Sequence, residues 1–129
     1  DWFNHGLEHQ ISGFYDLAHG AGLGISFPAW LEFLSDKKEC IEKLAQYAVR
    51  VWNVEMDFLH PEKTAKEGAG RLREFVRKAG LPLTLKEAGI GTERFEEIAD
   101  PMTDNGTHTC GAFYPMSRQD ILDLLKLMK

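Results

Sequence analysis

Residues 5–34 read HGLEHQISGFYDLAHGAGLGISFPAWLEFL. This stretch is dense in apolar and small residues and lacks the alternation of a strand, so it favours helices that are buried on more than one side. Ser12 and Gly13 mark a point where one helix can end and another begin. Pro28 should kink or restart the second helix, because it lacks a backbone donor and clashes with the preceding turn.

The rest of the chain also repeats apolar residues at the helical period of 3.6, and no segment shows a convincing strand period. Helix caps, glycines and prolines set the expected ends. The expected elements are a helix over 35–52 capped by Asp36 and Glu39, a helix from Pro61 to Ala79, a short turn over 84–89, a helix from Thr92 to about Ala99 limited by Pro101, a loop over 103–114, and a final helix capped by Ser117. The pattern predicts an all-α helical bundle.

Length and composition indicate one globular domain. The chain has 129 residues, of which 43% are hydrophobic, and a formal net charge of −5 with acidic and basic residues interleaved. A core of this size closes without disulfides, and the charge is not that of a nucleic-acid-binding protein. The apolar stretch over 21–34 is too short and too interrupted to span a membrane. Cys40 and Cys110 lie far apart and in no ligand spacing, so we expect a soluble protein of a reducing, cytoplasmic compartment.

The histidines gather near the start of the chain. His5, His9 and His19 fall in one short window together with Glu8 and Asp16. On one straight helix His5 and His19 would lie about 21 Å apart, so they can share an ion only if the chain folds back between them. His9 would then face the same cavity, one turn beyond His5. Carboxylates such as Glu8 and Asp16 can hydrogen-bond the distal nitrogens of ligand histidines, and solvation is the alternative interpretation.

Two other motifs compete for these residues. His5-Gly6-Leu7-Glu8-His9 matches H-x-x-E-H, the inverted zinc-peptidase motif in which Glu8 would be the general base. A peptidase also needs a third protein ligand and a substrate cleft. The glycine-rich run over 20–24 does not have the G-x-G-x-x-G spacing and follows no strand, so it is not a dinucleotide loop. Its small residues are better suited to a close approach between helices or to a ligand.

The same residues resemble a known family. The stretch from His5 to Trp30 closely resembles the metal-binding segment of iron-containing (group III) alcohol dehydrogenases, especially the NAD(P)H-dependent butanol dehydrogenase branch. The likeness consists of the separation of His5 and His19, the H-G-x-G tail that begins at His19, and the sequence from Gly111 to Met116 before an Asp-Ile helix. It therefore spans essentially the whole chain.

The resemblance implies that residues 1–129 form one domain, the C-terminal helical half of a dehydroquinate synthase-like fold. It implies an oxidoreductase in which His5 and His19 bind Fe(II) or Zn(II), while His9 lies near the nicotinamide and the substrate as a proton relay or cofactor-orienting group. The metal would act as a Lewis acid while hydride moves between an alcohol or aldehyde carbon and NAD(P)(H). An Asp and a His before the start of this chain would complete the metal site.

The chain opens with Asp1-Trp2-Phe3-Asn4-His5 and no initiator Met, so we expect a fragment that lacks an upstream NAD(P)-binding α/β domain. The isolated chain is then expected to be inactive, and the intact enzyme to be a homodimer. Two alternatives stay open at this point. One is a free-standing, non-catalytic helical binding module, and the other is the zinc peptidase that would use His5, Glu8 and His9.

Overall fold

A computed structural model describes residues 1–129 and contains helices without a β-sheet. The only strand-like feature is an isolated antiparallel bridge between Cys110 and Met116. The predicted all-α class is therefore confirmed. The helices are α1 (Phe3–Tyr15), α2 (His19–Leu34), α3 (Ile41–Trp52), α4 (Pro61–Lys78), α5 (Phe95–Met102) and α6 (Arg118–Leu127).

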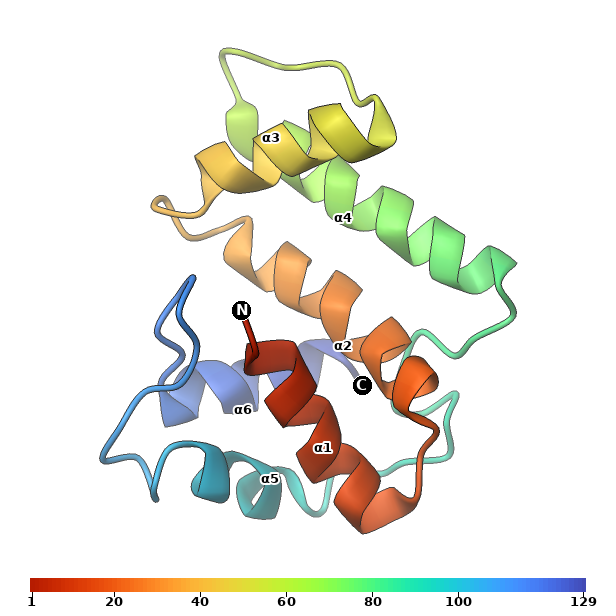
Figure 1. Cartoon of the computed structure of the whole chain (residues 1–129), viewed down its shortest axis with the longest axis vertical. Helices are drawn as coiled ribbons and strands as arrows, with labels where there is room; N and C mark the ends of the chain where they lie inside the picture. The colour runs from red at the N-terminus through yellow and green to blue at the C-terminus, as the bar shows by residue number, and fades with distance from the viewer.

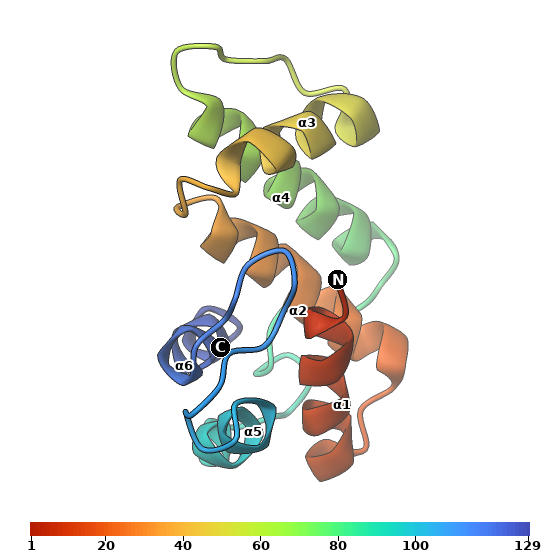
Figure 2. The same ribbon diagram turned by 60° about the vertical axis from the view of Figure 1, so that its left-hand side comes forward.

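Helix α2 occupies the middle of the molecule (Figure 1). It packs against α1 and α6 on one side and against α4 on the other, while α3 lies across α4. The view turned by 60° shows α1, α5 and α6 grouped at one end of the molecule and the α3–α4 pair at the other (Figure 2). This central position explains why most residues of α2 are buried.

Pro28 does not interrupt this central helix. Helix α2 runs from His19 to Leu34 with Pro28 inside it, so the predicted restart is wrong. The proline forgoes one backbone hydrogen bond. Packing on several sides, seen in the burial of neighbouring Ala29 and Trp30, offsets that loss and holds the helix in one piece.

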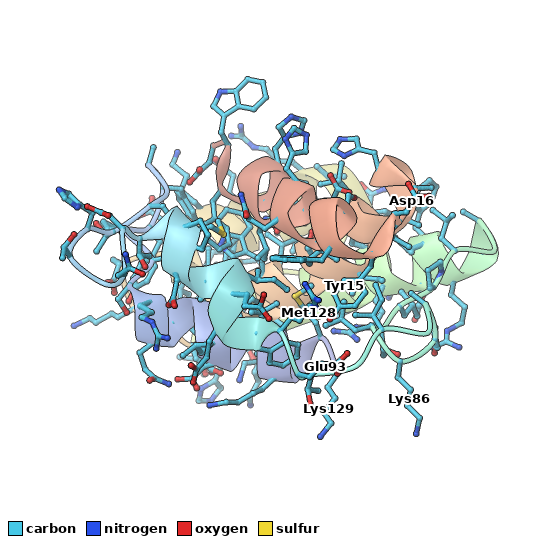
Figure 3. All side chains as sticks on the ribbon, turned by 90° about the horizontal axis from the view of Figure 1, so that it is seen from below. Tyr15, Asp16, Lys86, Glu93, Met128 and Lys129 are labelled. Carbon is cyan, nitrogen blue, oxygen red and sulfur yellow. The ribbon has the colours of Figure 1, made fainter.

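The first helix also continues beyond the expected break. Helix α1 passes through Ser12 and Gly13 and ends at Tyr15, and Asp16 adopts a left-handed conformation with φ of 49°. The Asp16 N–H bonds the carbonyl of Ser12 at 2.9 Å, which closes the helix end, and Figure 3 shows Asp16 at this point. The reversal expected between His5 and His19 exists, but it is made by residues 16–18.

Helix α3 begins at Ile41, six residues after the predicted start at residue 35. Residues 35–40 form turns, and their charged side chains reach other parts of the fold instead of capping α3. Asp36 pairs with Lys66 at 2.6 Å, and Lys37 pairs with Asp120 at 3.1 Å. The amphipathic pattern itself was correct, because Leu44 and Ala48 are buried.

The later boundaries agree better with the sequence. Helix α4 begins at Pro61 and ends at Lys78, shortly before Gly80, which has φ of +75°. Helix α5 begins only at Phe95 and includes Pro101 in its last turn, so Pro101 does not limit it. The predicted cap of α6 is confirmed as a reciprocal capping box between Ser117 and Asp120.

Both cysteines, Cys40 and Cys110, are free thiols. None of the helices combines the length and the apolar character that crossing a membrane requires.

Candidate metal centre

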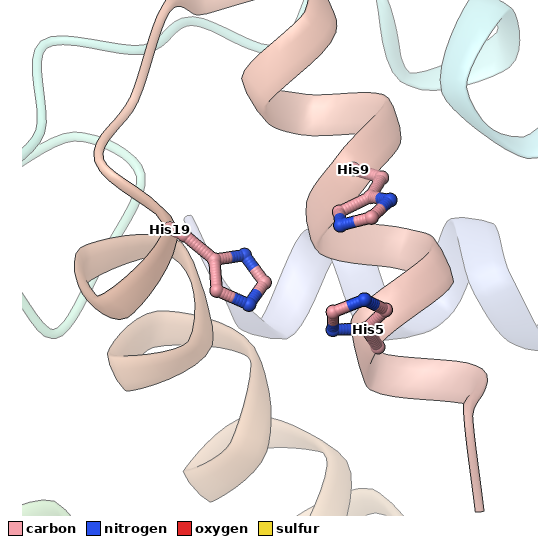
Figure 4. Close-up of side chains that lie close together, drawn as sticks. All are labelled: His5, His9 and His19. Carbon is pink, nitrogen blue, oxygen red and sulfur yellow. The ribbon is translucent and has the colours of Figure 1, made fainter.

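Two helices supply three imidazoles to one place on the surface. His5 and His9 lie one turn apart on α1, and His19 is the first residue of α2 and faces them across the gap (Figure 4). The ring centroids are 4.1 Å apart for His5 and His9, 4.9 Å for His5 and His19, and 5.5 Å for His9 and His19. The residues that the sequence singled out are therefore brought together.

The nitrogen atoms of the cluster fit the chemistry of a divalent transition metal. Each histidine offers one ring nitrogen, and these nitrogens all lie within 4.8 Å of one another. Imidazole is the common ligand of zinc and is also suited to iron. Three neutral nitrogen donors leave further coordination positions open to other ligands or to a substrate.

The cluster is open on one side. His5 is half-buried, whereas His9 and His19 are exposed. The edge of Trp2 lies against His5, with ring centroids 5.1 Å apart, and Trp2 is itself 78% exposed. A small molecule or another protein segment can therefore reach the three rings directly.

A buried carboxylate lies behind the cluster. Glu8 points into the protein from α1 and has no exposed side-chain surface. One carboxylate oxygen accepts from Nδ1 of His19, and the other accepts from the hydroxyl of Ser12. The Ser12 hydroxyl also lies 2.9 Å from the carbonyl oxygen of Leu17, in the reversal between α1 and α2.

Glycines let α2 approach its neighbours, as the sequence indicated. A Cβ added at Gly22 would lie 2.5 Å from Cγ of Glu8, so only glycine leaves space for that side chain. A Cβ at Gly24 would lie 3.1 Å from the side chain of Val76 on α4. Gly22 and Gly24 of the glycine-rich run therefore serve helix packing, whereas a Cβ at Gly20 would meet nothing within 4 Å.

The structure separates the remaining candidates. Asp16 ends α1 and forms no hydrogen bond or ion pair with the imidazoles, so of the two carboxylates considered only Glu8 bonds a histidine. His60 precedes α4 and pairs with Glu62 at 3.5 Å, and His108 lies in the late loop, so neither belongs to the cluster.

The peptidase alternative loses its general base. Glu8 is fully buried, and both of its oxygens are engaged by His19 and Ser12. A general base must reach the water that it activates. The arrangement of Glu8 therefore does not support peptide hydrolysis at His5 and His9.

Hollows lie beside both helices of the cluster. One of about 670 Å³ runs along α1, where Trp2, Gly6 and Met102 are among the lining residues. Another of about 580 Å³ runs along α2 and is mainly apolar, and it is lined in part by Phe27 and Phe113. Phe113 comes from the late loop, which the sequence pattern did not place beside α2.

Known proteins match the chain over its full length. Residues 1–128 match the Fe-containing alcohol dehydrogenase family, C-terminal part. The chain is 36% identical over 126 residues to the probable NADH-dependent butanol dehydrogenase 1 of Bacillus subtilis, covering 98% of this chain and 32% of that protein. It is 32% identical over 125 residues to the NADH-dependent butanol dehydrogenase A of Clostridium acetobutylicum, covering 97% of this chain and 32% of that protein.

Solved structures of related proteins have the same fold as this chain. The NADH-dependent butanol dehydrogenase A of Thermotoga maritima superposes with a TM-score of 0.83 at 29% identity, covering 99% of this chain and 33% of that one. The aldehyde reductase YqhD of Escherichia coli, at 23% identity and a TM-score of 0.85 over 100% of this chain and 33% of that one, shows the same fold. The chain thus spans about a third of the length of these relatives. The chain belongs to the Fe-containing alcohol dehydrogenase family, and it corresponds to the C-terminal domain of that family.

Proposed function

We propose that this chain is the metal-binding half of an alcohol dehydrogenase that transfers hydride between NAD(P)(H) and a primary alcohol or aldehyde. The observation that carries the proposal is the convergence of His5, His9 and His19 in a chain of this family. The relatives from Bacillus and Clostridium are NADH-dependent butanol dehydrogenases by name, which supports the choice of reaction and cofactor. The apolar lining of the hollow along α2 suits the hydrocarbon part of such a substrate.

The three histidines are given different roles. His5 and His19 face each other from two helices and would hold Fe(II) or Zn(II), together with an Asp and a His from the sequence that precedes this chain. When bound, the metal supplies a Lewis acid toward the oxygen of the substrate. His9 lies exposed beside this pair, where it would pass a proton to or from the alcohol oxygen, or orient the nicotinamide.

The cofactor would be bound mainly by a different domain. This chain is all-helical and carries no glycine-rich loop after a strand, which is the usual site for a dinucleotide. The relatives are about three times as long, because the aligned part makes up 32% of each of them. An upstream α/β domain would therefore bind NAD(P)(H) and close over the histidine cluster.

Metal titration of the chain tests the ligand roles. Binding of Co(II) or Zn(II) is measured by calorimetry for the unchanged chain and for His5→Ala, His9→Ala, His19→Ala and His60→Ala. We expect the His5 and His19 variants to lose at least tenfold in affinity, the His9 variant to lose less, and His60→Ala to bind as the unchanged chain does, since His60 lies outside the cluster. Equal affinity in the His5, His19 and unchanged chains would contradict the ligand assignment. A loss at His9 as large as at His5 would make His9 a ligand instead of a relay.

The coding sequence upstream of Asp1 tests the dehydrogenase assignment. An in-frame βαβ domain that carries a glycine-rich loop, an Asp and a His would support it, and its purified product should then reduce butyraldehyde with NADH or NADPH. A start codon directly before Asp1 would contradict the assignment and favour a non-catalytic helical module. Aldehyde reduction by the isolated chain would contradict the proposed division of labour between the domains.

A further inference from the structure

We propose that Glu8 is a positioning residue for the metal site: it holds Nδ1 of His19 from inside the protein and so presents Nε2 of His19 to the cluster. The inference rests on the proposed function, because it concerns how one of the proposed ligands is oriented. In the H-x-x-E-H motif, the same residue, Glu8, would instead be the general base of a zinc peptidase.

Burial makes the Glu8 contacts obligatory. The side chain has no exposed surface, and its only basic partner is His19. A buried carboxylate without hydrogen bonds costs several kcal/mol, so each oxygen needs a donor. The donors are the ring of His19 at one oxygen and the hydroxyl of Ser12 at the other. Because the side chain has no exposed surface, neither oxygen is open to a substrate or to solvent.

The contact fixes the tautomer of His19. A carboxylate can only accept hydrogen bonds, so the proton of a neutral His19 ring must lie on Nδ1. The lone pair is then on Nε2, which is the form that a metal ligand requires. Metal-ligating histidines commonly donate their second ring N–H to a carboxylate, which orients the ring and makes the ligand nitrogen more basic.

His19 needs such an anchor more than the other two histidines do. His5 and His9 share α1, and their one-turn spacing already places them together. His19 stands at the first position of α2 with nearly half of its side chain exposed, so little packing restrains its ring. The Glu8 carboxylate ties this ring to α1, the helix that carries the other two imidazoles.

Two small residues, Gly22 and Ser12, leave space for the Glu8 side chain and fix its position. Gly22 lies one turn along α2 from His19, and any Cβ there would overlap the Glu8 side chain at 2.5 Å from its Cγ. Ser12 lies one turn along α1 from Glu8, and its single hydroxyl proton is shared between the Glu8 carboxylate and the Leu17 carbonyl in the reversal. The position of Glu8 is thus coupled to the path of the chain that delivers His19.

The test compares three substitutions with a matched control. Glu8→Leu removes the acceptor and fills the space, Glu8→Gln keeps an acceptor oxygen, and Gly22→Ala displaces Glu8 without changing its chemistry. Gly13→Ala is the control, because a Cβ there meets nothing within 4 Å. Each variant is checked for folding by circular dichroism. The tautomer of His19 is read in the metal-free chain by two-bond ¹H–¹⁵N correlation NMR, and Co(II) affinity is read by titration.

We expect the Nδ1–H tautomer at His19 in the unchanged chain, in Gly13→Ala and in Glu8→Gln. Glu8→Leu and Gly22→Ala should shift the ring toward Nε2–H and weaken Co(II) binding by about 10- to 100-fold. If Glu8→Leu and Gly22→Ala leave both the His19 tautomer and the Co(II) affinity unchanged, the inference about Glu8 is overturned. The assignment of the metal ligands is not affected by that result. If the unchanged chain binds no Co(II), the three imidazoles do not hold the ion without the upstream ligands, and the tautomer of His19 decides whether Glu8 orients the ring. If Glu8→Leu does not fold, Gly22→Ala and Glu8→Gln carry the comparison.

Discussion

Gly68→Ala should destabilise the chain, because Gly68 of α4 lies directly against the backbone of α3 at Ala48. A Cβ at Gly68 would lie 2.6 Å from Cβ of Ala48 and 3.0 Å from its Cα. Carbon atoms in van der Waals contact lie about 3.5–4.0 Å apart, so the two helices would have to separate by about 1 Å. Ala48 is fully buried and has no rotamer through which it could yield.

Two opposing effects set the size of this loss. Overpacking a close helix contact costs about 1–3 kcal/mol, whereas replacing glycine by alanine inside a helix contributes up to about 1 kcal/mol. The net expectation for Gly68→Ala is a loss of up to about 2 kcal/mol in the free energy of unfolding. Gly70→Ala, two residues along the same helix, meets nothing within 4 Å and should gain about 0.5–1 kcal/mol.

Urea unfolding followed by circular dichroism measures both variants under the same conditions. The two midpoints should move in opposite directions, with similar slopes. In thermal unfolding each kcal/mol should correspond to about 4 °C for a domain of this length. Adding Ala48→Gly to Gly68→Ala removes the shortest contact, so the double variant should lose less than the sum of the single variants. If Gly68→Ala stabilised the chain as much as Gly70→Ala does, the close packing of α3 on α4 would be refuted. Strict additivity in the double variant would refute the direct contact between Gly68 and Ala48.

The remaining predictions concern one titrating group and the thiols. Burial opposes ionisation of Asp120, but hydrogen bonds from Ser117 and Lys37 outweigh it and lower the pKa of Asp120. Its stabilising effect is therefore full above the unfolded pKa and is lost as the pH falls through the lowered folded pKa. Asp120→Ala should lower the free energy of unfolding by about 1 kcal/mol at pH 7 and by progressively less below about pH 4. Urea titrations at several pH values measure this loss, and a loss that did not change with pH would contradict the lowered pKa of Asp120. Burial raises the pKa of both thiols, so the difference in exposure decides their order of reaction. Cys40 is 1% exposed and should react with a thiol reagent only on unfolding, after the half-buried Cys110, and equal rates for both would contradict the packing around Cys40.

The parts of the fold that depend on local pattern were predictable. The apolar period identified the four later helices, while the density of apolar and small residues indicated the first two. The Ser117–Asp120 box was confirmed because both of its hydrogen bonds lie within one turn. The pairing of His5 and His9 was predictable for the same reason, since residues four apart share a helix face. The position of His19 opposite His5 was predictable once the chain was expected to reverse direction between two helices.

The boundaries that failed were decided by contacts distant in sequence. Ser12 and Gly13 looked like a break, but the Ser12 hydroxyl binds Glu8 and the helix continues to Tyr15. Asp16 takes the left-handed position that glycine usually occupies, so no glycine marked the true end. Residues 35–40 looked like the first turn of α3 because their charges suit a cap, yet Lys37 and Asp36 are used by α6 and α4.

The role of Glu8 illustrates what a motif leaves undecided and what a helical period can add. The buried positions of α1 are 3, 4, 7, 8 and 11, which form one continuous stripe with Glu8 inside it. His5 and His9 lie on the flank of that stripe, so the two histidines face outward while Glu8 between them faces the core. A peptidase motif needs its glutamate on the same exposed face as the metal. The apolar period of α1 thus distinguishes a base from an internal anchor, and it does so from Phe3, Leu7 and Ile11 before any histidine is considered.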